Sequence, residues 1–138
     1  MTLIDTGPMV ALIDKGQPEL HQKCVSVFET LSAPFLTTWP CLTEAMYFLD
    51  RLRGWEAQNL LWGFVATGDL LLHTPSETEG QRMQFLMEKY QDTPMDLADA
   101  SLVALAEASD LKRIFTLDSD FYIYRIHDAE SFEVVPLN

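Results

Sequence analysis

Residues 96–118 read DLADASLVALAEASDLKRIFTLD, and this segment joins the two kinds of element from which the whole chain is built. Its first part, from Asp96 to Ser109, is rich in alanine and leucine and predicts a helix that packs closely on a sheet. Residues 113–116, which read RIFT, then predict a short strand. A helix that leads into a buried strand indicates an α/β protein.

The same alternation extends over the rest of the sequence. Strands are predicted at residues 2–4, 35–38 and 70–73 and near the end within 132–136, and helices at 9–13, 18–31, 40–52, 55–66 and 74–90. Strands that alternate with helices imply right-handed β-α-β units. We therefore expect a Rossmann-like, three-layer α/β/α sandwich with a central, mainly parallel sheet of four to five strands. Because no repeat or linker interrupts the pattern, residues 1–138 are expected to form a single domain.

The composition restricts the possible partners. The chain has 138 residues with 9 Lys+Arg against 21 Asp+Glu, a formal net charge of −12. This excess of acid argues against a basic-patch nucleic-acid binder and against docking on anionic membranes. Cys24 and Cys41 are the two cysteines and have no C-x-x-C spacing, which fits a reducing compartment. Without a signal peptide or an apolar run of roughly 20 residues, we expect a soluble, cytoplasmic protein and no membrane partner.

Five acids fall where a parallel sheet forms its ligand sites. Asp5 follows the first strand, Glu44 lies early in the helix after the second strand, and Asp118 follows the fourth strand. Asp96 and Asp99 begin the helix that leads into the fourth strand. Since ligands bind outside the carboxyl ends of the strands, we expect these carboxylates to face one place.

A group of carboxylates at one place predicts a metal site. Like charges at close range raise one another's pKa, and a divalent cation removes this cost. Oxygen ligands without accompanying His or Cys select Mg²⁺ or Mn²⁺. A carboxylate-held Mg²⁺ supports the attack of water on a phosphodiester.

Each acid also has a purely structural interpretation. Asp5 and Asp96 suit helix caps, and Asp118 and Asp120 suit turns. Glu44 is the hardest to explain in this way, although a solvated surface position stays open. The coincidence of their positions, rather than any single acid, favours the site.

Four blocks of the sequence resemble the PIN domain family. They are LIDTGPMVAL at residues 3–12, TTWPCLTE at 37–44, LADASLVALA at 97–106 and IFTLDSDF at 114–121. The blocks stand in family order. The resemblance implies a PIN-like fold and a Mg²⁺- or Mn²⁺-dependent ribonuclease that hydrolyses RNA. A chain of this length looks like the toxin of a VapC-type toxin–antitoxin pair, which implies a homodimer and a small cognate antitoxin.

The resemblance also assigns residues. The family's metal-binding and catalytic quartet is matched by Asp5, Glu44, Asp99 and Asp118. Four further residues are expected to be accessory: Asp96, Asp120, Thr6 and Thr116. Thr116 matches a hydroxyl often found near the metal, and Thr6 is placed to hydrogen-bond the Asp5 carboxylate or a water molecule. No histidine is expected to bind metal.

Other features suggest partners. The helix at 55–66 is apolar on more than one side, which makes it a candidate surface for a dimer or an antitoxin, with full burial as the alternative. Trp39 suits either base stacking or the core. Arg51 and Arg53 suit either the substrate or surface salt bridges. The net negative charge further predicts a basic antitoxin segment that reaches into the acidic site.

Two other functions compete with the ribonuclease. One is a PIN-type RNA- or protein-binding module with little catalytic activity. The other is a phosphatase or phospho-acceptor α/β domain, which also places an Asp after the first strand. Such phosphatases have Asp-x-Asp at that point, whereas this chain has Asp5-Thr6-Gly7. The presence of all four residues of the quartet argues against the binding module.

Overall fold

A central sheet of five strands organises the computed structural model, which describes residues 1–137. Its strands are β1 (Thr2–Ile4), β2 (Phe35–Thr38), β3 (Leu70–His73), β4 (Arg113–Phe115) and β7 (Glu133–Val134), in the order β3-β2-β1-β4-β7. Every neighbouring pair is parallel. In the central strand, Leu3 pairs with Leu36 on one side and Ile114 on the other. The expected parallel sheet is confirmed.

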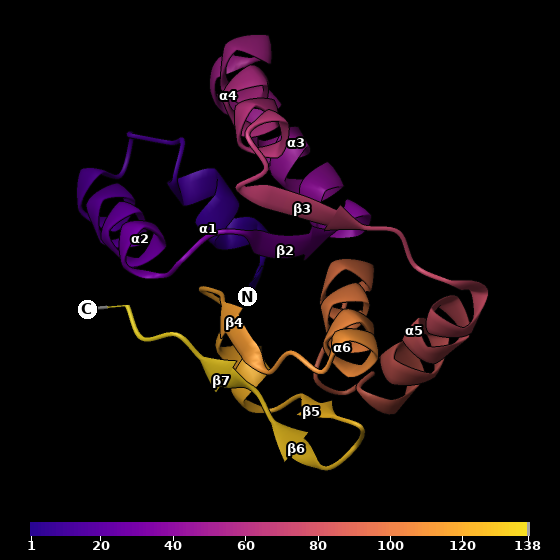
Figure 1. The fold of residues 1–138 in the computed structure, drawn as a ribbon. Coiled ribbons are helices and arrows are strands. Elements are labelled where there is room, and N and C mark those ends of the chain that lie inside the picture. The colour runs from indigo at the N-terminus through magenta and orange to yellow at the C-terminus, as the bar shows by residue number, and fades with distance from the viewer. Residues whose placement is uncertain (138) are drawn as a thin grey trace.

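Helices cover both faces of this sheet. They are α1 (Thr6–Ala11), α2 (Pro18–Thr30), α3 (Trp39–Arg53), α4 (Trp55–Ala66), α5 (Glu77–Lys89) and α6 (Leu97–Ser109). Figure 1 shows α1 and α2 on one side of the sheet and α5 and α6 on the other. The three layers therefore follow the α/β/α arrangement expected from the sequence.

Side-chain caps begin most of these helices. The carboxylates of Asp5 and Asp96 accept backbone N–H groups at the starts of α1 and α6. The hydroxyls of Thr38 and Ser76 do the same for α3 and α5. Such caps satisfy amide groups that have no partner within the first turn. Gly54 separates α3 from α4 with a φ of +61°, a conformation that is strained for other residues.

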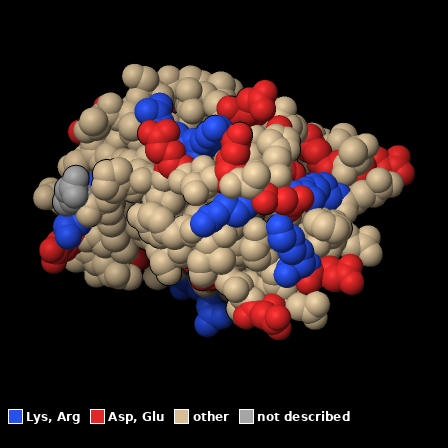
Figure 2. Space-filling view, turned by 90° about the horizontal axis from the view of Figure 1, so that it is seen from below, with Lys and Arg blue, Asp and Glu red and all other residues tan. Residues whose placement is uncertain are grey.

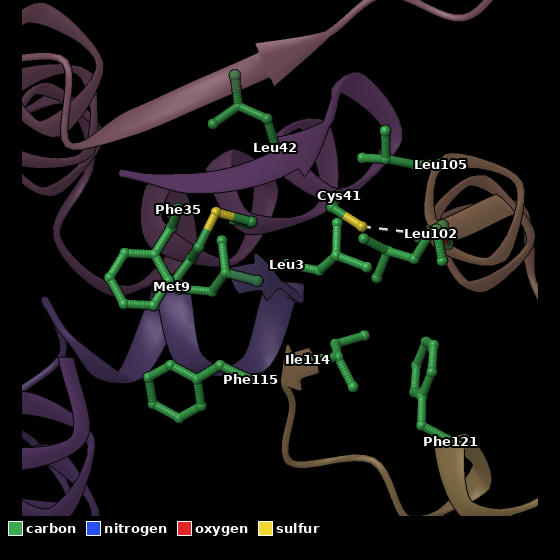
Figure 3. Packing of buried hydrophobic residues seen from close by; sticks show 14 of the residues in the cluster. Leu3, Met9, Phe35, Cys41, Leu42, Leu102, Leu105, Ile114, Phe115 and Phe121 are labelled. Atoms are coloured by element: carbon green, nitrogen blue, oxygen red, sulfur yellow. Dashed lines mark hydrogen bonds between the residues drawn. The ribbon is translucent and has the colours of Figure 1, made fainter. Parts of the chain in front are cut away.

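The core fills the space between the sheet and the helices on both of its faces. Nine consecutive residues of α6, from Ala98 to Ala106, are buried, and most have small side chains that allow close packing. On the sheet, the ring of Phe35 is fully buried and stacks on Phe28 with ring centroids 4.6 Å apart. Figure 3 shows Phe35 beside Met9 and Phe115. These apolar contacts hold the strands and helices whose ends carry the acids.

The C-terminal part differs from the prediction in one respect. After β4 the chain forms a 3₁₀ helix, η1 (Ser119–Tyr122), and an antiparallel pair, β5 (Arg125–Ile126) with β6 (Glu130–Ser131), none of which the sequence pattern predicts. Arg82 of α5 donates two hydrogen bonds to Glu107 and one to Asp128 of the connecting loop. On this face, acidic and basic side chains alternate (Figure 2). Long-range ion pairs therefore add to the buried side chains of Phe121, Tyr124 and Ile126 in fixing this segment.

Helix α1 spans Thr6–Ala11, whereas the pattern places the helix at residues 9–13. Asp5, which the sequence predicts as a possible cap, is its N-cap and accepts the N–H of Thr6 at 2.7 Å. Strand β4 ends at Phe115, one residue before the predicted end. The hydroxyl of the next residue, Thr116, points to the Asp5 carboxylate instead.

Helix α4 is only partly covered. Ala57 and Leu61 are buried, whereas Trp55, Leu60 and Trp62 are exposed. Full burial, one of the two alternatives for this helix, is therefore wrong. Among residues 1–137, no helix combines the length and apolarity required to cross a membrane.

Candidate active site

The strand order creates a crevice between β1 and β4. Along the chain, β2 and β3 lie on one side of β1, and β4 then returns to its other side. Connections leave β1 and β4 in opposite directions at such a switch point, which opens a ligand crevice outside their carboxyl ends. Asp5 follows β1 here, and Asp118 lies three residues beyond β4. Both acids therefore stand where open parallel sheets bind ligands.

A pocket of about 390 Å³ occupies this crevice. All four residues of the expected quartet line it, together with Asp96 and Thr6: Asp5, Thr6, Glu44, Asp96, Asp99 and Asp118. Thr116 lies behind Asp5 and contacts its carboxylate. Asp120 lies beside the pocket, where its backbone N–H donates to the Asp118 carboxylate at 2.9 Å. The fold thus brings carboxylates from three distant parts of the chain together.

Two hydrogen bonds fix the orientation of Asp5. Its Oδ1 accepts the backbone N–H of Thr6, and its Oδ2 accepts the hydroxyl of Thr116, both at 2.7 Å. The hydroxyl of Thr6 donates elsewhere, to the carbonyl of Cys41 on α3 at 3.2 Å. Thr6 therefore bonds Asp5 through its backbone, while its side chain ties α1 to the helix that carries Glu44.

Asp96 and Asp99 support each other at the start of α6. The N–H of Asp99 donates to the Asp96 carboxylate at 2.8 Å, and the N–H of Asp96 donates back to Asp99 at 3.3 Å. The buried phenol of Tyr124 donates to the same Asp99 oxygen at 3.3 Å. The Asp99 carboxylate is thereby held on the pocket side of α6.

Helix capping and the pocket use the same side chains. Asp5 caps α1, Asp96 caps α6 and Asp118 caps η1, and each of the three also lines the pocket. The structural and functional interpretations of these acids are therefore compatible. Helix N-termini carry a partial positive charge, which lowers the cost of gathering carboxylates here.

A close backbone approach positions Asp118. A Cβ atom on Gly7 of α1 would lie 3.2 Å from the Leu117 side chain. Since that distance is tighter than ordinary van der Waals contact, glycine lets the segment after β4 lie directly against α1. Asp118 thus reaches the pocket that Asp5 lines.

Four further residues at the site were not predicted to belong to it. Tyr124 contacts Asp99, and Cys41 places its sulfur 3.9 Å from Asp5, while Asp14 and His21 line the pocket. Cys41 stands three residues before Glu44 on α3, so helical spacing was a usable signal for it. For His21, the Nδ1–H donates to the carbonyl of Ala11 at 2.8 Å, so this nitrogen has a structural partner.

Burial and charge repulsion raise the pKa of two carboxyl groups at the site. Desolvation raises the pKa of Asp5 from its usual 3.8 to about 6, against the lowering effect of the Thr116 and Thr6 hydrogen bonds. The charges of Asp118 and Glu44 make smaller raising contributions to this value. Desolvation also holds the pKa of Asp99 well above its usual range, reinforced by the charges of Asp96 and Asp5. The pocket therefore favours either a bound proton or a bound cation.

The raised pKa of Asp5 predicts a pH-dependent stability for the metal-free protein. Below pH 4 the folded state gains the full benefit of binding this proton, and the benefit is lost as the pH rises through about 6. In EDTA, Asp5→Asn is therefore expected to stabilise the protein relative to wild type by about 1–3 kcal/mol more at pH 7.5 than at pH 4.5. Urea unfolding at the two pH values measures this difference.

The control for this experiment is Asp50→Asn, which alters an exposed acid of α3. It is expected to leave the difference between the two pH values unchanged. If the free energy of unfolding of Asp5→Asn differed from that of wild type by the same amount at both pH values, the proposed desolvation of Asp5 would be contradicted.

The donor chemistry of the pocket fits a hard divalent cation. Six carboxyl side chains line it, and none of the described lining residues is Lys or Arg; the six are Asp5, Asp14, Glu44, Asp96, Asp99 and Asp118. Carboxylate oxygens of this kind suit Mg²⁺ or Mn²⁺. Within residues 1–137, no three His, Cys, Asp or Glu side chains converge closely enough to hold a metal ion. An ion shared by three of these carboxylates therefore requires some side-chain movement.

The structure is thus an open parallel α/β sheet with an acidic pocket at the point where the strand order reverses. The PIN domain model matches residues 2–126, and the chain therefore belongs to the PIN domain family. It is 29% identical over 136 residues to ribonuclease VapC26 of Mycobacterium tuberculosis, which covers 97% of this chain and 99% of the relative. The resemblance stated from the sequence is thus confirmed.

Solved structures share the fold. VapC20 of Mycobacterium tuberculosis, described as a toxin that cleaves the sarcin–ricin loop, has a TM-score of 0.79 at 14% identity, covering 87% of this chain and 92% of that one. A toxin–antitoxin complex from Klebsiella pneumoniae has a TM-score of 0.63 at 20% identity, covering 88% and 90%. FitAcB from Neisseria gonorrhoeae has a TM-score of 0.63 at 16% identity, covering 96% and 97%. These matches confirm the PIN-like architecture.

Proposed function

We propose that this chain is a metal-dependent endoribonuclease that hydrolyses RNA phosphodiester bonds as the toxin of a toxin–antitoxin pair. The observation that carries the proposal is the pocket at the switch point, which Asp5, Glu44, Asp99 and Asp118 line with no Lys or Arg among the described lining residues. Similarity to a relative named as a ribonuclease, over nearly the full length of both chains, supports RNA as the substrate.

The four acids are the proposed ligands of Mg²⁺ or Mn²⁺. When bound, such an ion activates water for attack on phosphorus and stabilises the charge that develops on the leaving oxygen. Asp5 is the best-positioned ligand, because Thr6 and Thr116 already fix both of its oxygens. Tyr124 and the Asp96 N–H hold Asp99 in the same way. These outer contacts orient the ligands before the substrate arrives.

Water is the proposed nucleophile, because the side chains at the site are poor ones. Burial, together with the nearby Asp5 charge, raises the pKa of Cys41 to about 12, so that this thiol stays protonated at neutral pH. The thiolate is the reactive form of cysteine, and it is absent here. A hydrolytic route with water as nucleophile needs none of these side chains to form a covalent intermediate.

A small antitoxin and a second copy of the chain are the proposed protein partners. A structural relative is described as a toxin–antitoxin complex. On this chain, the exposed apolar side chains Trp55, Leu60 and Trp62 of α4 offer a surface for one of these partners. The acidic pocket suits a basic antitoxin segment, since opposite charges promote and orient association.

Cleavage of a structured RNA tests the proposal. We expect the purified protein to cut in Mg²⁺ and to stop when EDTA is added, because the acids need a cation to act on a phosphodiester. Asp5→Asn, purified in parallel, is expected to lose the activity. Equal cutting by wild type and Asp5→Asn would identify a contaminating nuclease and contradict the proposal.

The alternative function is a PIN-type RNA- or protein-binding module with little catalysis. The observation that favours it is the lack of convergence of three potential ligands within residues 1–137. Calorimetric titration with Mg²⁺ followed by the cleavage assay separates the two functions. Binding of Mg²⁺ without cleavage of any RNA tested would support the binding module.

A further inference from the structure

A second groove opens beside the carboxylate pocket, between the first turns of α3 and α6. It has a volume of about 660 Å³. One wall is formed by Trp39, Thr43 and Tyr47, which are spaced four residues apart and therefore share one face of α3. The opposite wall includes Leu97 of α6. Glu44 and Asp96 line both the groove and the pocket, so that the two cavities are neighbours.

The groove exposes apolar surface that the fold itself does not use. Trp39 is 42% exposed, Tyr47 57% and Leu97 52%. The walls are nevertheless firmly joined, because the hydroxyl of Thr38 at the start of α3 bonds that of Ser101 on α6 at 2.6 Å. The indole N–H of Trp39 donates to the hydroxyl of Thr74 at 3.3 Å. These contacts fix the start of α3 and the Trp39 ring in the groove beside the pocket.

Charge identifies the kind of contact that this groove can make. Its described lining contains two acids and no Lys or Arg, and the whole chain carries a net charge of −12. Contacts to phosphate are therefore unfavourable along its walls. Aromatic rings bind nucleobases by stacking, which requires no positive charge and tolerates any base sequence. The uncharged base of a nucleotide fits these walls better than its phosphate does.

The side chain of Arg51 provides a positive charge next to Tyr47. Arg51 donates from its guanidinium to the phenol oxygen of Tyr47 at 2.9 Å, and its Cζ lies 5.7 Å from the centre of that ring. The guanidinium thus lies over the Tyr47 ring and adds one positive charge at this end of the groove. A flanking phosphate has a partner here that the groove itself does not provide.

From these observations we infer that the groove is a base-binding subsite for an unpaired nucleotide next to the phosphate that is cut. The base stacks on Trp39 and Tyr47, and Arg51 contacts the flanking phosphate. This inference rests on the proposed ribonuclease function, because the neighbouring phosphate is the one held at the carboxylate pocket. It assigns Trp39 and Tyr47 to substrate binding and leaves the chemistry to the acids.

Kinetics of Trp39→Ala test the subsite. We expect KM for cleavage of the structured RNA to rise about 5- to 100-fold, which corresponds to the loss of one stacked base, while kcat changes less than about threefold. Trp39→Phe keeps an aromatic face and is expected to recover most of the affinity. Tyr47→Ala is expected to act in the same direction. Phe85→Ala, which removes a ring that is 51% exposed on α5, is the matched control and is expected to leave both constants unchanged.

A binding experiment separates this inference from the proposed function. A fluorescein-labelled RNA of twelve uridines is titrated onto Asp5→Asn, with and without Trp39→Ala, in Mg²⁺. A loss of RNA affinity of about 5- to 100-fold on removal of Trp39 supports the subsite even if no variant cleaves RNA. Unchanged binding and unchanged KM in both Trp39→Ala and Tyr47→Ala would overturn it. Loss of self-association in these variants, with KM unchanged, would overturn it in favour of a protein interface.

Discussion

Replacement of Asp99 by asparagine is expected to reduce RNA cleavage at least about 100-fold and, in the same protein, to stabilise the metal-free fold. The first effect follows from the loss of a proposed metal ligand, since even the outer partners of such ligands typically contribute 10- to 100-fold. The second follows from the pKa of Asp99, which burial and the charges of Asp96 and Asp5 hold well above its usual range. An uncharged amide removes that repulsion at neutral pH.

Two measurements check these opposite effects. The initial rate of cleavage in Mg²⁺ reports the function, and the midpoint of thermal unfolding in EDTA at pH 7.5 reports the stability. The rise in midpoint that Mg²⁺ gives to wild type is expected to shrink in Asp99→Asn, because ligands that bind only the folded state stabilise it. Asparagine can still accept one hydrogen bond from Tyr124 or from the Asp96 N–H.

The matched control is Asp110→Asn at the end of the same helix. Asp110 is exposed and has a φ of +57°, a conformation that asparagine tolerates well. It is expected to change neither the cleavage rate nor the response to Mg²⁺. If Asp99→Asn cleaved at the wild-type rate, Asp99 would be a helix-capping residue without a role in metal binding.

The sequence predicts the sheet well because its strands are short apolar runs between strong breaks. The bounds of β2 and β3 are those predicted, at residues 35–38 and 70–73, as are those of α4 at 55–66. Pro34, Gly54 and Gly68 punctuate these elements and make their ends visible in the sequence. Local chemistry is sufficient for such elements.

The segment after β4 depends on contacts that no local pattern contains. The β5–β6 pair has few apolar residues, and its loop is held by Arg82 and Lys89, which both contact Asp128. The backbone N–H of His127 donates to Glu107, 20 residues earlier in the chain. These partners lie on α5 and α6. Their proximity follows from the packed helices, and therefore could not be read from residues 125–131 alone.

The residues of the candidate site also differ in how readily the sequence predicts them. Asp5, Glu44, Asp99 and Asp118 are visible in the sequence because each lies near the carboxyl end of a strand or at a helix start that faces this edge. Tyr124 is not visible, because it reaches Asp99 only after the chain has turned through η1. The sequence thus predicts the acids that line the pocket more readily than the residues that hydrogen-bond them.

Truncation of Phe35 to alanine is expected to lower the free energy of unfolding by about 3–5 kcal/mol. Phe35 is fully buried at the start of β2, where it stacks on Phe28 and lies 6.4 Å, centroid to centroid, from Phe115 of β4. Its removal loses the free energy gained by burying the ring, and the cavity left among the surrounding rings adds a further cost. Urea unfolding at fixed pH measures the change.

The loss should extend to the site, since β2 leads directly into α3 and Glu44. Domains of this kind are commonly stable by only about 5–15 kcal/mol, so Phe35→Ala is expected to weaken activity at 37 °C through unfolding instead of through chemistry. Phe35→Leu, which keeps most of the volume, is expected to cost less than about 1.5 kcal/mol and to retain cleavage. Phe85→Ala on the surface of α5 is expected to cost less than about 1 kcal/mol. If Phe35→Ala cost no more than Phe85→Ala, the aromatic stack between α2 and the sheet would not be the element that holds β2, and with it Glu44, in place.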